Sequence, residues 1–376
     1  MKKVELITLQ NVPNYGSVLQ AYATQEIIKK MGYRVEIIDY FPNRMTKKAM
    51  LLRIKNKGLI FKKSFIIRNI ARMVIFPSYM LRFNIFKKFK KKYLNTTSKI
   101  YKNNSELLQD IPKADIYCTG SDQVWNSSWN EGIDKALFLD FVPKNKKCIA
   151  FSASFGKRQL ELSEIQDTKK LLIKYKYISL REKSGVKILN DLGIHNAINV
   201  LDPTLLLTLS EWEKISFNRF KGEKYIFVYN LNRNKKIDHY ARNLSNNTGL
   251  KIKYLSYQIH DFYKQGKMYC NPAVEIFLDL IKNAEYIITD SFHAIAFSLT
   301  FNREFVIVYP NKFSTRLKNI LELTDLQNRV AMDENDLAVI NEKINYKKVN
   351  KILNDERCKS MNWLKNALND GGKNVY

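Results

Sequence analysis

The chain has 376 residues, 45% of them hydrophobic and 26% charged, and carries a formal net charge of +27. This length exceeds what one typical hydrophobic core uses and favours two domains. The charge predicts a polyanionic partner, which is nucleic acid, an acidic membrane surface or a phosphorylated substrate. No apolar run approaches the roughly 20 residues of a membrane-spanning helix, so we expect no such span.

Cysteine and histidine are too dispersed to predict a metal site. The four cysteines include no C-x-x-C pair, and the four histidines include no H-E-x-x-H motif. Scattered cysteines are typical of a reduced cytoplasmic protein. At the start of the chain, Glu5 and Gln10 interrupt the apolar stretch that a signal peptide needs, so we expect a β-strand there.

The first predicted unit is a strand, a helix and a second strand, at Val4–Leu9, Ser17–Met31 and Arg34–Tyr40. The loop before the helix contains Asn14, whose amide can donate or accept, and Gly16, which allows backbone to approach a ligand closely. This pattern is Rossmann-like, but it lacks the G-x-G-x-x-G turn of dinucleotide-binding proteins. A tight turn without a ligand is the alternative interpretation.

A basic segment follows. From Tyr40 to Ser105 the sequence has no Asp or Glu, while Lys and Arg recur among apolar residues and end in the run Lys87–Lys92. Basic amphipathic helices suit an anionic membrane surface, so we expect a helical insertion at about 45–105 that contacts such a surface through residues 47–93. Nucleic acid is the rival partner, although no nucleic-acid-binding motif is present. A solvated helical insertion is the third interpretation.

The next predicted strands are Ala114–Thr119, Leu137–Phe141, Cys148–Ser154 and Tyr177–Leu180. A turn of small and polar residues, Gly120–Asn126, follows the first of them and carries a carboxylate, an amide and an indole. Arg181 follows the last. Its planar guanidinium suits a carboxylate or phosphate, and a salt bridge to Glu182 is the alternative.

The central stretch of the second half is Ala284–Tyr309, which predicts a strand, a short helix and a further strand. His293 lies in the first turn of the helix Phe292–Phe301, beyond the carboxyl end of the strand Tyr286–Thr289. Ligands bind at this edge of open α/β sheets. A helix amino terminus attracts an anion and lowers the pKa of a histidine, so His293 is a candidate acid/base group. A buried histidine bonded to a carbonyl is the alternative.

These patterns together predict an α/β protein with two domains. The first would span residues 1–209 and include the basic insertion, and the second would span residues 210–376. We expect the C-terminal helix Lys347–Leu368 to pack back onto the first half.

Five short motifs, in the same order and with similar spacing, resemble those of the polysaccharide pyruvyl transferase family. The motifs are Asn14–Tyr22 (NYGSVLQAY), Gly120–Asn126 (GSDQVWN), Ser179–Gly185 (SLREKSG), Leu201–Thr204 (LDPT) and Thr289–His293 (TDSFH). The resemblance runs from about residue 3 to residue 330. It implies two Rossmann-like domains facing each other across a cleft, as in glycosyltransferases of the B type.

The resemblance also implies an activity. A pyruvyl group would pass from phosphoenolpyruvate to two hydroxyls of a sugar, forming a cyclic ketal in a cell-surface polysaccharide or its lipid-linked precursor. No metal or other cofactor is implied, and no nucleic-acid partner. The enzyme would be cytoplasmic and peripheral to the inner face of the membrane.

Roles for single residues follow from the resemblance. His293 and Asp122 would be catalytic, His293 as acid and base and Asp122 as a base for the hydroxyl proton or as a structural turn residue. The expected donor-binding residues are Asn14, Gly16, Ser121, Arg181, Ser291 and Arg316. The expected acceptor-binding residues are Tyr15, Gln123 and Trp125.

The sequence departs from the family pattern twice. Ala294 stands where many relatives have glycine, and Ser291 stands where some have arginine, which shifts the expected donor contacts to Arg181 and Arg316. Two other functions remain open at this point: a nucleotide-sugar glycosyltransferase of the same architecture, and a basic membrane-associated scaffold.

Overall fold

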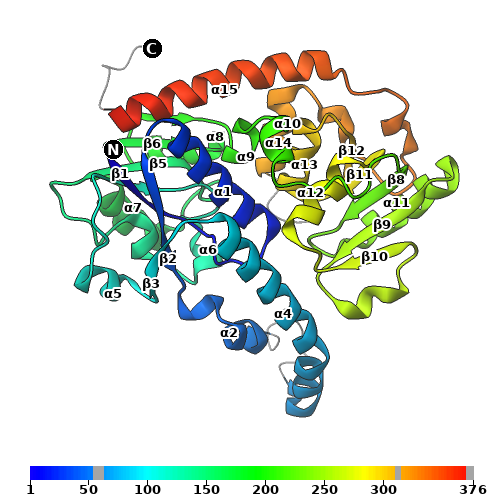
Figure 1. Cartoon of the computed structure of the whole chain (residues 1–376), viewed down its shortest axis with the longest axis horizontal. Coiled ribbons are helices and arrows are strands. Elements are labelled where there is room, and N and C mark those ends of the chain that lie inside the picture. The colour runs from blue at the N-terminus through cyan, green and yellow to red at the C-terminus, as the bar shows by residue number, and fades with distance from the viewer. Residues whose placement is uncertain (54–62, 310–314, 370–376) are drawn as a thin grey trace.

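The computed structural model describes residues 1–53, 63–309 and 315–369. Within these residues the chain forms two α/β halves, each built on one parallel sheet (Figure 1). Two Rossmann-like units were predicted, and this architecture confirms them.

The first sheet has seven strands, in the order β3-β2-β1-β4-β5-β6-β7. Their bounds in this order are Thr96–Tyr101, Arg34–Tyr40, Lys3–Ile7, Ile116–Thr119, Lys147–Ala153, Tyr177–Leu180 and Ala197–Asn199. All neighbours in the sheet are parallel. The loops after β1, β4 and β6 therefore leave the sheet at one edge.

The second sheet has five parallel strands, in the order β10-β9-β8-β11-β12. Their bounds in this order are Lys267–Cys270, Lys251–Ser256, Tyr225–Tyr229, Tyr286–Thr289 and Glu304–Ile307. The β-branched and aromatic side chains of β8 and β11 are buried on both faces, as a central parallel strand requires.

Helices connect the strands. In the first half they are α1 (Tyr15–Lys30), α2 (Lys47–Leu52), α4 (Phe65–Tyr93), α5 (Asn104–Gln109), α6 (Ser127–Asn130), α7 (Ile165–Leu172), α8 (Lys183–Asp191) and α9 (Pro203–Leu206). The remaining helices are α10 (Leu209–Glu213), α11 (Lys235–Thr248), α12 (Val274–Lys282), α13 (Phe292–Thr300), α14 (Thr315–Thr324) and α15 (Tyr346–Asn369).

One predicted strand is absent. Leu137–Phe141 was expected to be a strand, but Lys135–Phe138 forms a 3-10 helix capped by the side chain of Asp134, and Leu139 has a φ of +57°. The carbonyl of Leu137 accepts hydrogen bonds from the Trp125 indole at 3.1 Å and from the Thr119 hydroxyl at 3.1 Å. Because side chains satisfy this carbonyl, no neighbouring strand is needed to pair with it.

The basic insertion is an enlarged crossover between β2 and β3, which are neighbours in the sheet. It contains α2 and α4, and residues 54–62 of the expected segment lie outside the described part of the chain. Near its carboxyl end α4 buries Phe86 and Phe89 against the first half. Its other end extends away from both sheets (Figure 1).

The C-terminal helix α15 spans both halves (Figure 1). Near its end Ser360 accepts a hydrogen bond from the backbone of Leu201 at 3.0 Å, and Trp363 stacks on Phe151 of β5 with 6.3 Å between ring centroids. The helix therefore packs on the first half although the strands that precede it belong to the second.

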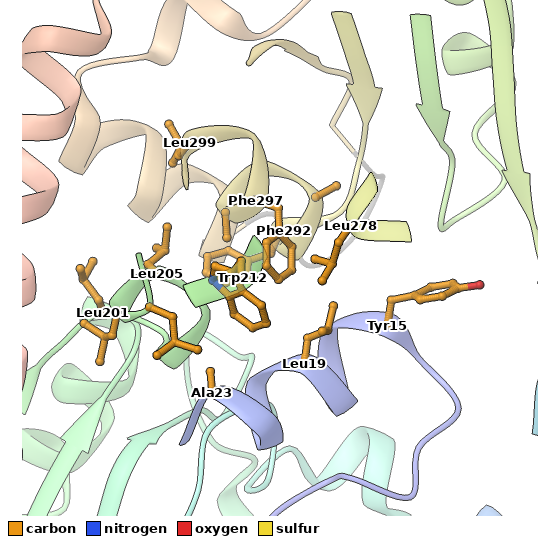
Figure 2. Packing of buried hydrophobic residues seen from close by; sticks show 14 of the residues in the cluster. Tyr15, Leu19, Ala23, Leu201, Leu205, Trp212, Leu278, Phe292, Phe297 and Leu299 are labelled. Carbon is orange, nitrogen blue, oxygen red and sulfur yellow. The ribbon is translucent and has the colours of Figure 1, made fainter. Parts of the chain in front are cut away.

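A continuous apolar seam joins the halves (Figure 2). Leu19 of α1 faces Phe292 and Phe297 of α13 with Trp212 between them, whereas Tyr15 points away from these residues and stacks on Phe277 of α12 at 4.6 Å. Trp212 is fully buried, meets Phe297 edge to face at 4.9 Å and donates its indole N–H to the carbonyl of Thr204 at 3.2 Å. The amino ends of α1 and α13 are thereby fixed relative to each other.

Candidate active site

A cavity of about 350 Å³ lies between the two halves. The first half contributes polar side chains from the loops at the carboxyl edge of its sheet, and the second contributes the start of α13 and of α14. The polar residues of these segments that line it are Asn14, Ser17, Asp122, Gln123, Asp290, Ser291, His293 and Arg316. Apolar residues, among them Leu9, Val12, Met45, Met50 and Trp129, form another part of the wall.

The amino end of α1 packs directly on His293. Asn14 caps this helix, and its side-chain oxygen accepts from the backbone N–H groups of Gly16 and Ser17. A Cβ placed on Gly16 would lie 1.9 Å from Nδ1 of His293, which no side chain tolerates. Gly16 is therefore needed because the imidazole occupies the space where a side chain would be, rather than to contact a donor as expected.

His293 itself is in the first turn of α13, as predicted. No side-chain hydrogen bond caps this helix, although Ser291 is its N-cap residue and lines the cavity. The amino end of the helix therefore points unsatisfied N–H groups and partial positive charge toward the cavity. Nε2 of His293 is buried and has no hydrogen-bond partner in the part of the chain that the structure describes.

The protonation state of His293 follows from its surroundings. Burial lowers the pKa of His293 to about 4, with Arg181 and Arg316 adding to the shift while Asp202 and Asp122 oppose it. The imidazole is therefore neutral near pH 7, with a ring nitrogen free to accept a proton.

Arg181 lies beneath this site rather than in it. Its side chain has no exposed surface, and its two terminal nitrogens bond Asp122 at 2.9 Å and Asp202 at 2.8 Å. The ring of Phe292 lies over the guanidinium, with 5.3 Å between them. We therefore correct the expected donor contact of Arg181: its hydrogen-bonding groups are used by buried carboxylates, and it does not line the cavity.

The carboxylates of this network stay ionised. Burial alone would raise the pKa of Asp122, but the charge of Arg181 outweighs it, together with Arg316 and with His293 in the acid range where that ring is protonated, and the pKa is held well below its usual range. Ser17 also donates to Asp122 at 2.7 Å, and Asp122 has a φ of +72°. The pKa of Asp202 is lowered in the same way, with Arg181 as the main opposing charge to burial.

Asp202 is the member of this network that sequence reasoning did not select. It caps α9 by accepting from the Thr204 backbone N–H, and it also accepts from the hydroxyl of Ser121 at 2.9 Å. Ser121 is fully buried, and it does not line the cavity. This corrects the donor contact that was expected of it. The available signal was the Asp-Pro pair, which places a capping carboxylate before a helix.

Two expected acceptor contacts are also corrected. Tyr15 is fully buried in the seam, where it stacks on Phe277 at 4.6 Å and donates to the carbonyl of Pro272 at 2.7 Å. Trp125 is buried below the turn and stacks on Phe138 at 5.3 Å. These large aromatic side chains next to turns of small residues therefore belong to the hydrophobic core. Of the three expected acceptor-binding residues, only Gln123 lines the cavity.

Four arginines line the cavity, and two of them are ion-paired, Arg44 with Asp134 at 2.5 Å and Arg53 with Glu131 at 2.6 Å. Arg316 lines it from the start of α14, and no ion pair or hydrogen bond of its guanidinium is found with the described residues. Burial and the neighbouring Arg181 lower the pKa of Arg316 to about 10, so it remains charged at pH 7. Arg82 of α4 also lines the cavity, with its guanidinium 3.7 Å from the ring centroid of Tyr257 and its Nε bonded to the carbonyl of Pro13 at 2.6 Å.

A metal site is not apparent in the part of the chain that the structure describes. No three or more His, Cys, Asp or Glu side chains are grouped there so as to hold an ion.

Comparison with solved structures identifies the fold. A UDP-N-acetylglucosamine 2-epimerase superposes with a TM-score of 0.56 at 10% identity, over 100% of this chain and 98% of its own. A putative UDP-N-acetylglucosamine 2-epimerase from Listeria monocytogenes gives 0.53 at 9% identity, over 99% and 98%. One from Methanocaldococcus jannaschii, solved with UDP-GlcNAc and UDP, gives 0.50 at 14%, over 98% and 99%. The glycosyltransferase B-like architecture is thereby confirmed.

Comparison at the level of sequence identifies the family. No curated protein matches the chain. The family model described as polysaccharide pyruvyl transferase matches residues 14–312, which include Gly16, Asp122, Arg181 and His293. The chain therefore belongs to the polysaccharide pyruvyl transferase family, whose members are transferases of polysaccharide pyruvylation.

Proposed function

We propose that this protein transfers a pyruvyl group from phosphoenolpyruvate to two hydroxyls of a saccharide, in a cell-surface polysaccharide or its lipid-linked precursor. The observation that carries the proposal is a neutral, buried His293 at the amino end of α13, in a cavity that is also lined by Arg316, whose guanidinium has no ion pair or hydrogen bond with the described residues. This arrangement suits a small dianion that must exchange protons with an imidazole.

The donor would be bound by a positively charged side chain and by backbone N–H groups. Arg316 supplies a planar fork for the phosphate or carboxylate, and the first turn of α13 with Ser291 supplies N–H and hydroxyl donors. Asn14 lines the same cavity with its side-chain oxygen used by the α1 cap. No metal or other cofactor takes part in the proposed reaction.

The reaction moves two hydroxyl protons, and one histidine is sufficient to transfer the first of them. The first acceptor hydroxyl oxygen bonds to C2 of the donor, and its proton ends on the methylene carbon, which becomes the methyl group. The second hydroxyl oxygen also bonds to C2, and its proton leaves with phosphate when the C2–O bond to the phosphate breaks. Neutral His293 is suited to take a hydroxyl proton and to return it to the methylene carbon.

Asp122 is not proposed as the base for the hydroxyl proton, which was one of its two expected roles. A carboxyl whose pKa is held this low is a weak base, and its oxygens are occupied by Arg181 and Ser17. We assign it to stabilising the protonated form of His293 by charge. Gln123, which lines the cavity, is the remaining candidate for contact with the acceptor.

The proposal includes a location. The four cysteines are free, which suits a reducing cytoplasm. The basic segment, residues 47–93, would hold the protein at the inner face of the membrane by charge.

An assay of released products tests the proposal. The protein is incubated with phosphoenolpyruvate and a saccharide acceptor, and in parallel with a nucleotide sugar and the same acceptor. Release of inorganic phosphate together with a ketal-bearing product supports the pyruvyl transferase. Release of a nucleoside diphosphate would identify a glycosyltransferase instead, and no turnover with any acceptor would favour a scaffold.

Replacing His293 by glutamine should lower turnover by at least about 10²-fold, the usual scale of acid/base catalysis, because glutamine cannot carry the proton. Donor binding should persist, since the cationic groups remain. His239→Gln is the control, because this histidine is exposed on α11. Wild-type turnover in the His293 variant would remove the histidine from the mechanism.

The Gly16→Ala variant tests the packing of α1 on the imidazole. The new methyl group cannot coexist with Nδ1 at 1.9 Å, so the ring must move and turnover should fall at least about tenfold. Gly185→Ala in α8 is the control, because the three atoms nearest to its methyl group all belong to the Leu180 side chain, the closest at 3.1 Å. Unchanged turnover in Gly16→Ala would show that the position of the imidazole is not critical.

The Arg316→Met variant should raise the KM for phosphoenolpyruvate about tenfold or more, because a charge-assisted hydrogen bond contributes about 1.5–3 kcal/mol. Arg316→Lys should recover only part of the loss, since lysine lacks the planar fork. Lys318→Met, an exposed change on the same helix, should leave KM unchanged. An unaltered KM in Arg316→Met would contradict the assigned donor contact.

The pKa of His293 also predicts a pH dependence of stability. The unfolded chain binds a proton at His293 near the ordinary pKa of 6.5, whereas the folded chain binds it near 4. Stability is therefore present above about 6.5 and lost as the pH falls toward 4, by roughly 2–3 kcal/mol. Urea unfolding at several pH values should show this loss in the wild type and not in His293→Gln; parallel curves for the two proteins would exclude the shift.

A further inference from the structure

The outer half of α4 exposes a concentration of apolar side chains. Seven large apolar residues within this half have exposed fractions between 43% and 70%. They are Phe65, Ile66, Ile67, Ile70, Met73, Val74 and Phe76. Soluble proteins rarely leave so many neighbouring apolar side chains in water unless the patch binds something.

The spacing of these residues forms a stripe. Ile66, Ile70 and Met73 recur at intervals of four and three residues, which places them on one face of the helix. Arg68 and Arg72 lie on the opposite face and are partly buried. The helix is therefore amphipathic in its outer half, and it turns the apolar side outward. We call Phe65–Phe76 the apolar stripe.

The charge around the stripe indicates its partner. No acidic residue occurs between Tyr40 and Ser105, so every charged side chain of this segment is basic. Lys63, at the start of the stripe, is exposed, as are Lys87, Lys88 and Lys91 further along α4. A large apolar face set among cations fits a surface that offers both hydrocarbon and negative charge, which is an anionic lipid bilayer.

We propose that the apolar stripe of α4 inserts into an anionic lipid bilayer, while exposed lysines of the same segment, such as Lys63, contact its headgroups. This goes beyond attraction by charge, because it assigns the contact to the outer end of α4. The run Lys87–Lys92 lies at the other end, where Lys90 pairs with Asp39 at 2.9 Å and Lys92 with Glu275 at 3.5 Å.

The same helix reaches the cavity. Arg82 lines the cavity and lies twelve residues after Ile70, about 18 Å further along the helix axis at 1.5 Å per residue. Insertion of the stripe would therefore hold the cavity near the lipid surface. None of the helices that the structure describes has the length and hydropathy of a membrane span, so the contact is peripheral.

Vesicle binding of the full chain without substrates tests the insertion. The vesicles contain phosphatidylglycerol and phosphatidylcholine in equal parts, or phosphatidylcholine alone. The triple variant Ile66→Ser, Ile70→Ser, Met73→Ser should bind the anionic vesicles at least about tenfold more weakly than the wild type. The double variant Leu162→Ser, Ile173→Ser should bind like the wild type, because it removes apolar residues of comparable or greater exposure, 89% and 66%, that lie outside α4.

Two further measurements separate insertion from its rivals. At high salt, wild-type binding should weaken but persist, because screening removes only the contribution of charge. A tryptophan at Ile70 should be quenched by brominated lipids, and one at Leu162 should not. The proposal would be overturned if the triple variant bound the vesicles as well as the wild type, or if high salt released the wild type completely. It would also be overturned if the wild type did not bind vesicles but formed a dimer that the triple variant abolished.

Loss of vesicle binding can be distinguished from loss of the transferase reaction. The stripe residues do not line the cavity, so the triple variant should keep its turnover with a water-soluble acceptor.

Discussion

The site depends on one buried charge, the guanidinium of Arg181. It bonds a carboxylate from the turn after β4 and a carboxylate from the cap of α9, so it ties Asp122 and Asp202 to the end of β6. Removing one partner of such a network is expensive, since it leaves a buried charge unpaired, at about 3–5 kcal/mol. The guanidinium of this network also lies against the ring of Phe292, the residue directly before His293, with 5.3 Å between them. The buried ion pairs therefore help to position the imidazole.

The balance of these charges determines what the cavity accepts. Besides burial, charges of both signs act on the pKa of His293: Asp202 and Asp122 raise it, whereas Arg181 and Arg316 lower it. A dianion placed beside Arg316 adds negative charge next to His293 and raises its pKa. Donor binding would thus prepare the histidine to hold the proton that the reaction moves, and the histidine would lose the proton again when phosphate leaves.

The elements near the site could be predicted because their local patterns agree with their final environment. The strand Tyr286–Thr289 and the helix after it are both apolar on all sides, and both are buried on all sides. His293 could be found because it stands at a strand–helix junction. The role of Arg181 could not be predicted, because its acidic partners are distant in sequence. Leu137–Phe141 reads as a strand, yet a cap and two side-chain donors to Leu137 favour a 3-10 helix. Tyr15 and Trp125 were misassigned because aromatic residues beside a polar turn serve equally well as core or as binding surface.

The seam explains how the cavity keeps its shape. Tyr15, Leu19, Phe292 and Phe297 belong to one apolar cluster that contains residues of both halves, so the halves share a core. An interface of this kind resists relative motion of domains far more than a polar contact does. Tyr15 stands directly before Gly16, and Phe292 directly before His293, so the residues that fix the seam are covalent neighbours of those that meet in the cavity. The distance between the helix α1 and the imidazole is therefore set by packing before any substrate arrives, which is the preorganisation that the proposed proton transfer requires.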